Sequence, residues 1–339
     1  MSGKKSRANE LTAVLNRSLF DELPSGITAP KDVARWRRYR QRYHVAQSLG
    51  EFCFPLQLDF ELNSHCNLRC SFCTHGHEVI KKKTLPFHDF AKVIDEGERY
   101  GLCSIKLNYI NEPLLVPDIC KYIDYARARG VLNVYFATNG TLLDDAKIDE
   151  LIDAKVSKVM VSLDATTAET FALMRHSNQF DQIVGNVRRL LNRRAERGVS
   201  WPLVRVNFLK TELNIHEADD FVSLWSGVAD MIGFQDRVNL PGIDNDLTAP
   251  SPLPVLENDK RDFRCSFPYK LMVVDSNGDI LPCCTFSGRA LPMGNVADMT
   301  IREAWDGLKM RKLKRLHRDG GYAANPVCKH CVESSGATL

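Results

Sequence analysis

The sequence lacks the long apolar stretches that would place it in a membrane. No run approaches the ~18–20 uninterrupted apolar residues of a transmembrane helix. Its first residues are polar and basic, without the apolar core of a secretory signal, so we expect a cytoplasmic protein. Disulfides are rare in that compartment, and the eleven cysteines are therefore expected to be reduced thiols or metal ligands.

The chain also has little net charge, a formal +3, but the charge is unevenly distributed. Residues 1–49 carry ten Lys and Arg against four Asp and Glu, and Trp36 and Tyr39 are interleaved with the arginines. Such a pattern can bind nucleic acid. It is more typical of a helix with a solvated basic face whose aromatic side chains pack on the protein. We expect this helix over 30–49, and no nucleic acid partner.

Three cysteines are close together in the sequence after the first apolar run. Residues 56–62 read as a strand, and a C-x3-C-x2-C motif follows, made by Cys66, Cys70 and Cys73. Thiolates on a short turn hold iron–sulfur clusters, and a cubane of four irons needs one ligand per iron. Three ligands leave one iron open to another molecule. The alternative is a zinc site, which His75 or His77 would complete.

This motif, with Phe72 directly before its third cysteine, resembles that of the radical S-adenosylmethionine (SAM) enzymes. In that family the open iron binds the amino and carboxylate groups of SAM. An electron from the cluster then cleaves SAM to a 5′-deoxyadenosyl radical. The resemblance implies that Phe72 belongs to the cofactor-binding residues, and that a flavodoxin- or ferredoxin-type protein supplies the electron.

Strand and helix patterns alternate from residue 56 onward. Six strands are expected, at 56–62, 103–109, 131–137, 156–163, 203–208 and 231–240. The amphipathic stretches between them read as helices, at 87–100, 117–129, 144–154, 180–197 and 216–227. This alternation indicates an α/β fold with a parallel sheet and helices outside it. The resemblance implies a partial (β/α)6 barrel, open at one side.

Polar residues follow the expected strands at their carboxyl ends, where barrel enzymes keep their chemistry. Glu112 follows the second strand, at the position of the family's Gly-Gly-Glu motif, and the resemblance implies that it contacts the amino group of SAM. Here Ile110 and Asn111 replace the two glycines. The resemblance assigns further SAM-binding positions to Asn139, Ser162, Asp164 and Arg175.

A second set of cysteines lies beyond 244–264, a segment whose Pro, Ser and Asp content indicates a linker. Asn277-Gly278 between two short apolar runs is a strong hairpin signal. Such a hairpin would fold the second run back along the first and bring Cys283 near Cys265. A single helix is expected over 301–317, and a CxxC motif follows it near the end of the sequence. Four thiols suffice for a closed cluster site, and they are Cys265, Cys283, Cys328 and Cys331.

This second set resembles the shortened SPASM domain called twitch, which holds one auxiliary 4Fe–4S cluster. Zinc in a ribbon-like site is the alternative, and Cys284 is not expected to be a ligand. The expected organisation has four parts: a basic helical extension at 1–55, a radical SAM partial barrel at 56–243, a linker at 244–264, and a small α+β twitch/SPASM-like domain at 265–339.

The two resemblances imply a radical SAM oxidoreductase that attacks an unactivated C–H bond. We expect oxidation of a carbohydrate-like or aminocyclitol alcohol, a small-molecule substrate.

A radical epimerase is one alternative, and it needs a thiol hydrogen donor, for which Cys284 is available. A peptide-modifying maturase is another, although no segment is long enough for a leader-recognition domain. A two-site metal-binding structural or regulatory protein is disfavoured, because it has no use for the strand-end polar set. No catalytic base is identified.

Overall fold

The computed structural model describes residues 14–15, 23–24, 26–49, 52–77, 80–237 and 263–334 of the 339-residue chain. The expected linker lies outside these residues except for its last two. Within the described ranges, no helix is long and apolar enough to cross a membrane.

The described strands form one ten-stranded sheet in the order β1-β7-β6-β5-β4-β3-β2-β8-β9-β10. Six neighbouring strands run parallel, as expected: β2 (Gln57–Phe60), β3 (Ser104–Lys106), β4 (Asn133–Thr138), β5 (Lys158–Ser162), β6 (Leu203–Lys210) and β7 (Met231–Asp236). They do not close on each other, since β7 pairs with β1 (Val14–Leu15) and β2 pairs with β8 (Leu271–Val274). The partial barrel is confirmed.

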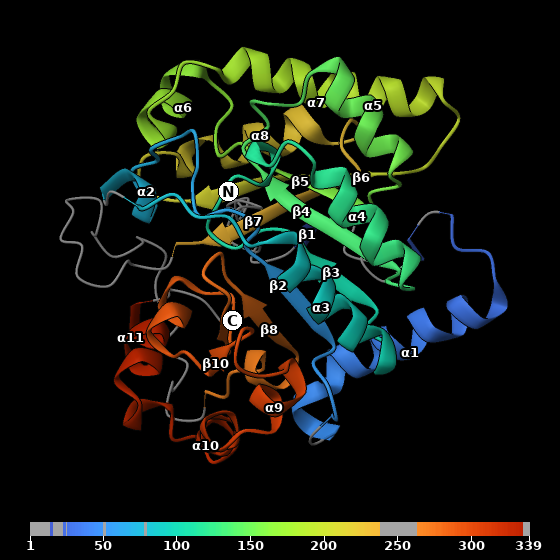
Figure 1. Ribbon diagram of the computed structural model, residues 1–339. Helices are drawn as coiled ribbons and strands as arrows, with labels where there is room; N and C mark the ends of the chain where they lie inside the picture. The colour runs from blue at the N-terminus through green and yellow to red at the C-terminus, as the bar shows by residue number, and fades with distance from the viewer. Residues whose placement is uncertain are drawn as a thin grey trace, which may run out of the picture.

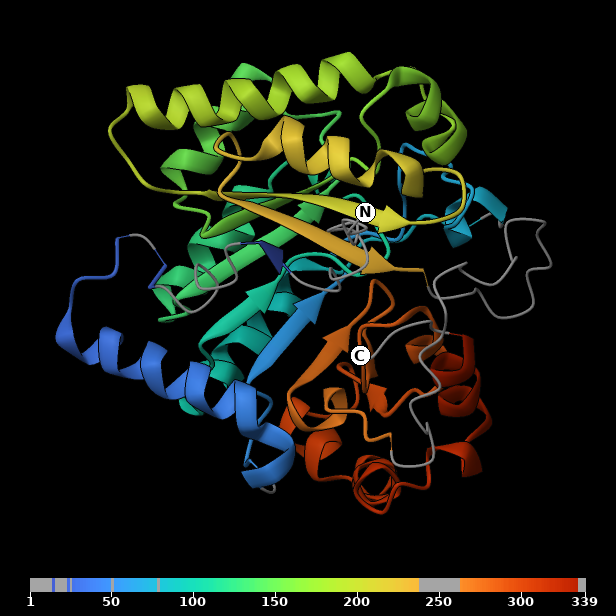
Figure 2. The ribbon, with the colours of Figure 1, turned by 180° about the vertical axis from the view of Figure 1, so that it is seen from behind.

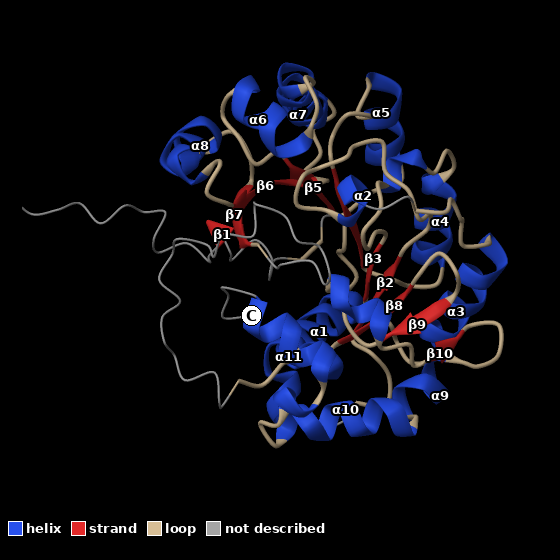
Figure 3. Ribbon diagram, turned by 90° about the vertical axis from the view of Figure 1, so that its left-hand side faces the viewer, coloured by secondary structure: helices blue, strands red, loops and turns tan. Residues whose placement is uncertain are grey.

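Helices cover the outer face of the curved sheet (Figure 3). Those expected from periodicity are α3 (Phe87–Arg99), α4 (Ile119–Ala128), α5 (Asp145–Asp153), α7 (Phe180–Glu196) and α8 (Ala218–Trp225). Two short helices were not expected, α2 (Thr74–His77) and α6 (Ala168–Arg175), because a segment of one or two turns gives little periodic signal. Alternate strand residues such as Leu58, Ile105 and Val134 face the helices and are fully buried, so the polar residues between them face the barrel interior.

The basic helix forms as expected, as α1 (Pro30–Leu49), and lies beside the sheet (Figure 2). Trp36 and Tyr39 are buried in one cluster with Leu56, Cys103 and Leu132, which directly precede β2, β3 and β4. Helix α1 therefore packs at the amino ends of these strands, opposite the end where the candidate site lies.

The C-terminal part extends the barrel's sheet (Figure 1). Strand β8 runs parallel to β2, and β9 (Asp279–Leu281) and β10 (Gly294–Asn295) continue antiparallel. The expected hairpin is confirmed, with Gly278 at φ +82°, a left-handed conformation that favours glycine. The single helix expected at 301–317 is wrong: it breaks at Gly307 into α9 (Ile301–Asp306) and α10 (Leu308–Arg318), and α11 (Pro326–Ser334) follows.

Candidate active site

The three thiols of the first motif lie together in the loop that follows β2. The pKa of the Cys66 and Cys70 thiols is raised to about 11, mainly by burial and in smaller part by a neighbouring thiol of the motif. Helix α2 folds tightly against this loop: a Cβ on Gly76 would lie 2.3 Å from the Cys70 carbonyl oxygen. Thiols this buried ionise readily only when a metal compensates their charge. The donor set therefore fits a metal cluster.

Glu112 and Asn139 join the same loop through hydrogen bonds. The buried Glu112 carboxylate accepts from Thr138 Oγ1 and Asn139 N, both at 2.7 Å, and from Leu114 N at 3.1 Å. The Asn139 amide donates to Asn67 Oδ1 at 2.7 Å and lies 3.8 Å from Cys66 Sγ. Burial raises the pKa of Glu112 to about 7, although these donors lower it. A carboxylate has about four acceptor positions, so one remains for a ligand.

Asp164 and Arg175 form a buried ion pair that also contacts the motif. Asp164 also accepts from Leu209 N at 2.7 Å, so both of its oxygens have protein donors. Arg175 reaches the motif, with Nη1 3.7 Å from Cys70 Sγ and its guanidinium 5.4 Å from the centre of the Phe72 ring. Asp164 thus orients an arginine whose positive charge favours the Cys70 thiolate. Ser162 is half-buried at the end of β5, paired in register with Asn207.

The second set of thiols converges on one pocket of the C-terminal part. Cys265, Cys283, Cys328 and Cys331 all line it. Burial raises the pKa of Cys328 to about 12 and also raises that of Cys265, and in each case Cys283 and Cys331 add to the rise. As thiolates these four groups would repel one another unless a metal compensated their charge, so the chemistry of this donor set also fits a cluster.

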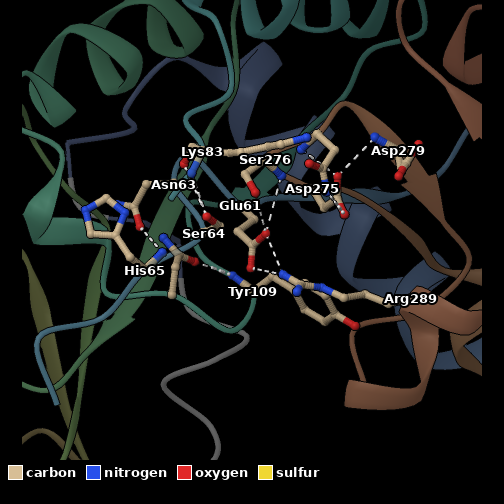
Figure 4. Close-up of polar contacts among 12 residues, drawn as sticks. Glu61, Asn63, Ser64, His65, Lys83, Tyr109, Asp275, Ser276, Asp279 and Arg289 are labelled. Atoms are coloured by element: carbon tan, nitrogen blue, oxygen red, sulfur yellow. Dashed lines mark hydrogen bonds and ion pairs between the residues drawn. The ribbon is translucent and has the colours of Figure 1, made fainter. Parts of the chain in front are cut away.

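An ion pair between a buried carboxylate and a partly exposed arginine joins the barrel to the loop that carries Cys283 (Figure 4). Glu61, in the segment after β2, is fully buried, and Arg289 Nη2 donates to its two oxygens at 2.6 and 2.7 Å. Ser276 Oγ donates to the same carboxylate at 3.0 Å. The Arg289 guanidinium lies 5.4 Å from the ring centre of Tyr109, whose hydroxyl donates to the carbonyl of Thr285. The auxiliary loop is therefore tied to the segment that leads from β3 to Glu112.

A row of polar side chains crosses the interior face of the barrel. Strand register places Asp59 beside Lys106, and Lys106 beside Tyr135. Burial raises the pKa of Asp59 to about 6, while Lys106 and a hydrogen bond from Gln57 lower it. Cys284 also reaches this row, since its thiol pKa is raised by Asp59 and lowered by Lys106, after burial as the main cause. The interior therefore offers acid, base and thiol groups beside the auxiliary loop.

The sequence prediction missed the interior acids and Arg289. Asp59 and Glu61 had a usable signal: with Gln57 they place a polar residue at every second position of an otherwise apolar strand, which indicates a strand with one polar face. Arg289 had none, because its partner Glu61 is 228 residues away in the sequence.

Comparison with known proteins is consistent with this geometry. Residues 60–203 match the model of the radical SAM superfamily, and residues 265–332 match that of an iron–sulfur cluster-binding domain, SPASM. The chain is similar to the mycofactocin maturase MftC of Mycobacterium tuberculosis, with 31% identity over 51% of this chain and 42% of that protein. It spans about half the length of the first curated relatives it matches.

Two further likenesses cover more of the chain. A tungsten-containing aldehyde ferredoxin oxidoreductase cofactor-modifying protein of Pyrococcus furiosus is 24% identical over 81% of this chain and 86% of that protein. A crystal structure of BtrN in complex with AdoMet and 2-DOIA superposes with a TM-score of 0.54 and 16% identity, over 83% of this chain and 94% of that one. This last likeness is one of fold.

Proposed function

Because the chain belongs to the radical SAM superfamily and carries a SPASM-type iron–sulfur domain, we propose that it oxidises an alcohol carbon of a carbohydrate-like or aminocyclitol substrate. Bound SAM and the 4Fe–4S cluster of this family supply a 5′-deoxyadenosyl radical, which removes a hydrogen atom from an unactivated carbon. The observation that carries the proposal is the position of the four-thiol pocket. Its loop is tied to the barrel by the Tyr109 hydroxyl, which donates to the carbonyl of Thr285. An electron acceptor there suits an oxidation.

The proposal assigns the residues as follows. The motif after β2 holds the SAM-binding cluster, and a flavodoxin- or ferredoxin-type protein reduces it. The four-thiol pocket holds the auxiliary cluster. Glu112 binds the SAM ammonium. Arg175 stabilises the Cys70 thiolate, and Asp164 orients the Arg175 side chain. Asn139 links Glu112 to the cluster loop.

Asp59 is the proposed proton acceptor. In this oxidation the substrate C–H bond would break, and its hydrogen atom would form the new C–H bond of deoxyadenosine. The O–H proton of the substrate radical would go to the Asp59 carboxylate, and a cluster held by the four thiols of the pocket would accept the remaining electron as the C=O bond forms. Burial raises the pKa of Asp59 to about 6, so it is a carboxylate at pH 7 and a better base than an exposed aspartate. The polar row around it suits a hydroxylated substrate.

Glu112→Ala is expected to weaken SAM binding, because it removes the charged partner of the ammonium. A lost charge-assisted hydrogen bond costs about 1.5–3 kcal/mol, roughly a 10- to 150-fold loss of affinity. Equilibrium binding of SAM to the anaerobically reconstituted protein measures this loss of affinity.

The matched control is Glu217→Ala. Glu217 is also a buried carboxylate that accepts from a threonine hydroxyl and a backbone N–H, those of Thr167 and Thr166. Both variants should lower the Tm, since both leave donors unsatisfied, but only Glu112→Ala should weaken SAM binding. Equal SAM affinity in the two variants contradicts the assignment of Glu112.

The proposed reaction is tested by product mass. Reduced holoprotein, SAM and a panel of aminocyclitols and sugar alcohols should give a product lighter than its substrate by two hydrogens. One deoxyadenosine forms per turnover in either an oxidation or an epimerisation, so that ratio is not diagnostic. A product of unchanged mass that gains one solvent deuterium in heavy water rejects oxidation.

Epimerisation is a second candidate because Cys284 lies near Asp59 and Lys106. A thiol in that place can return a hydrogen atom to a substrate carbon. Cys284→Ala should leave an oxidation largely intact and should stop an epimerisation.

Similarity to a maturase over half of the chain favours a third candidate, peptide modification. The substrate panel therefore includes any short peptide encoded beside the gene.

A further inference from the structure

Two buried polar side chains in the four-thiol pocket lack hydrogen-bond partners. Ser287 is 5% exposed and His317 is 2% exposed, and both line the pocket together with the four thiols. Neither Ser287 Oγ nor His317 Nδ1 has a hydrogen-bond partner among the residues that the structure describes. The other lining side chains are mainly apolar, among them Phe267 and Leu313.

Such orphaned groups need an explanation. A buried donor without a hydrogen-bond partner costs about 1–3 kcal/mol, and folded proteins rarely contain such a donor. Thr285, in the same pocket, shows the usual situation, since its hydroxyl lies 3.5 Å from Cys283 Sγ. Because the pocket walls offer Ser287 and His317 no acceptor, the acceptor must belong to what fills the pocket.

The two groups approach the pocket from separate elements. Ser287 lies in the 3₁₀ segment η8 (Phe286–Ala290), four residues after Cys283. His317 lies near the end of α10, one turn after Leu313, and residues four apart share one face of a helix. Both Leu313 and His317 line the pocket, so this face of α10 forms its wall. A neutral imidazole donates from one ring nitrogen, and here Nδ1 can be that donor.

We propose that Ser287 and His317 donate hydrogen bonds to sulfur atoms of the auxiliary cluster and so raise its reduction potential. This inference rests on the proposed auxiliary cluster. Reduction adds negative charge to a cluster, and hydrogen bonds to its sulfurs stabilise that charge, which raises the potential. Both residues tune the acceptor without touching the substrate. They would decide how readily the auxiliary cluster accepts the substrate's electron.

The test is a redox titration of the reconstituted full-length protein, with the auxiliary cluster followed by electron paramagnetic resonance. His317→Phe and Ser287→Ala each remove a donor. Each should reduce the equilibrium constant for one-electron reduction about tenfold, which is a fall in potential of about 59 mV. His317→Asn can present an amide N–H near the place of Nδ1 and should restore most of the potential. Leu313→Met, which removes no donor, is the control and should leave the potential unchanged.

Iron content separates the possible failures. Full iron content with unchanged potential in His317→Phe and Ser287→Ala overturns the inference but leaves the cluster assignment intact. Loss of iron in His317→Phe alone would make His317 a ligand, which also overturns the hydrogen-bond role. Wild-type protein without iron at the four-thiol pocket overturns both the inference and the proposed auxiliary cluster. Ser287→Ala keeps the test decisive where His317→Phe does not fold.

Discussion

Cys70→Ala is expected to abolish the conversion of SAM to 5′-deoxyadenosine by dithionite-reduced protein. Cys70 is the middle ligand of the first motif, is 6% exposed, and is the thiol that Arg175 approaches. With two thiolates left, the site cannot supply three of the four ligands that a cubane needs. Chromatographic assay of deoxyadenosine formed per chain measures the loss, which should be complete.

The iron content should follow the same logic. Wild-type protein should hold roughly eight irons, two Cys-bound cubanes, and replacement of all three motif cysteines by alanine should leave roughly four. Cys120→Ala is the matched control, since Cys120 is a half-buried thiol of α4 that donates to the Glu150 carbonyl and belongs to neither set. Zinc bound at either site in place of iron would reject the corresponding cluster.

Cys328→Ala is expected to uncouple SAM cleavage from product formation. It removes one of four thiols from the auxiliary pocket and leaves the barrel motif intact. The substrate radical then has no nearby acceptor for its second electron. Deoxyadenosine should still form at a largely unchanged rate, while the ketone should disappear. Both products are measured in the same reaction by mass spectrometry.

Lys329→Ala is the control for this second prediction. Lys329 lies between the two thiols of the CxxC motif on α11, is exposed, and lines no part of the pocket. Its replacement tests whether any change in this turn disturbs the reaction. Unimpaired ketone formation by Cys328→Ala, at full SAM cleavage, would show that the electron leaves by another path.

Most of the fold was predictable from periodicity because each element buries one face of its own. Phe180, Ile183, Val187 and Leu190 form one buried stripe of α7, and such a stripe is visible in the sequence. The pairing of β8 with β2 was not predictable, since more than 200 residues separate the two strands and no local pattern specifies the partner. Gly307 likewise divides the helix expected at 301–317 into α9 and α10.

The site was predictable to the extent that its chemistry is local in sequence. The first three thiols lie within eight residues, so their spacing alone identified the motif. Glu112 and Asn139 required the resemblance, because each only follows a strand. Arg289, Ser287 and His317 were missed, since their roles depend on a pocket assembled from distant elements. Their signal is a missing partner, which only a three-dimensional arrangement reveals.

The position of β2 between β3 and β8 has a consequence for synthesis on the ribosome. One edge of β2 pairs with residues 104–106, while the other waits for residues 271–274. At the usual elongation rate of 5–20 residues per second, that edge stays open for roughly 10–40 s. Open strand edges pair readily with other chains. The strand that leads into the first cysteine motif is therefore exposed during translation until residues 271–274, in the last quarter of the chain, have been made.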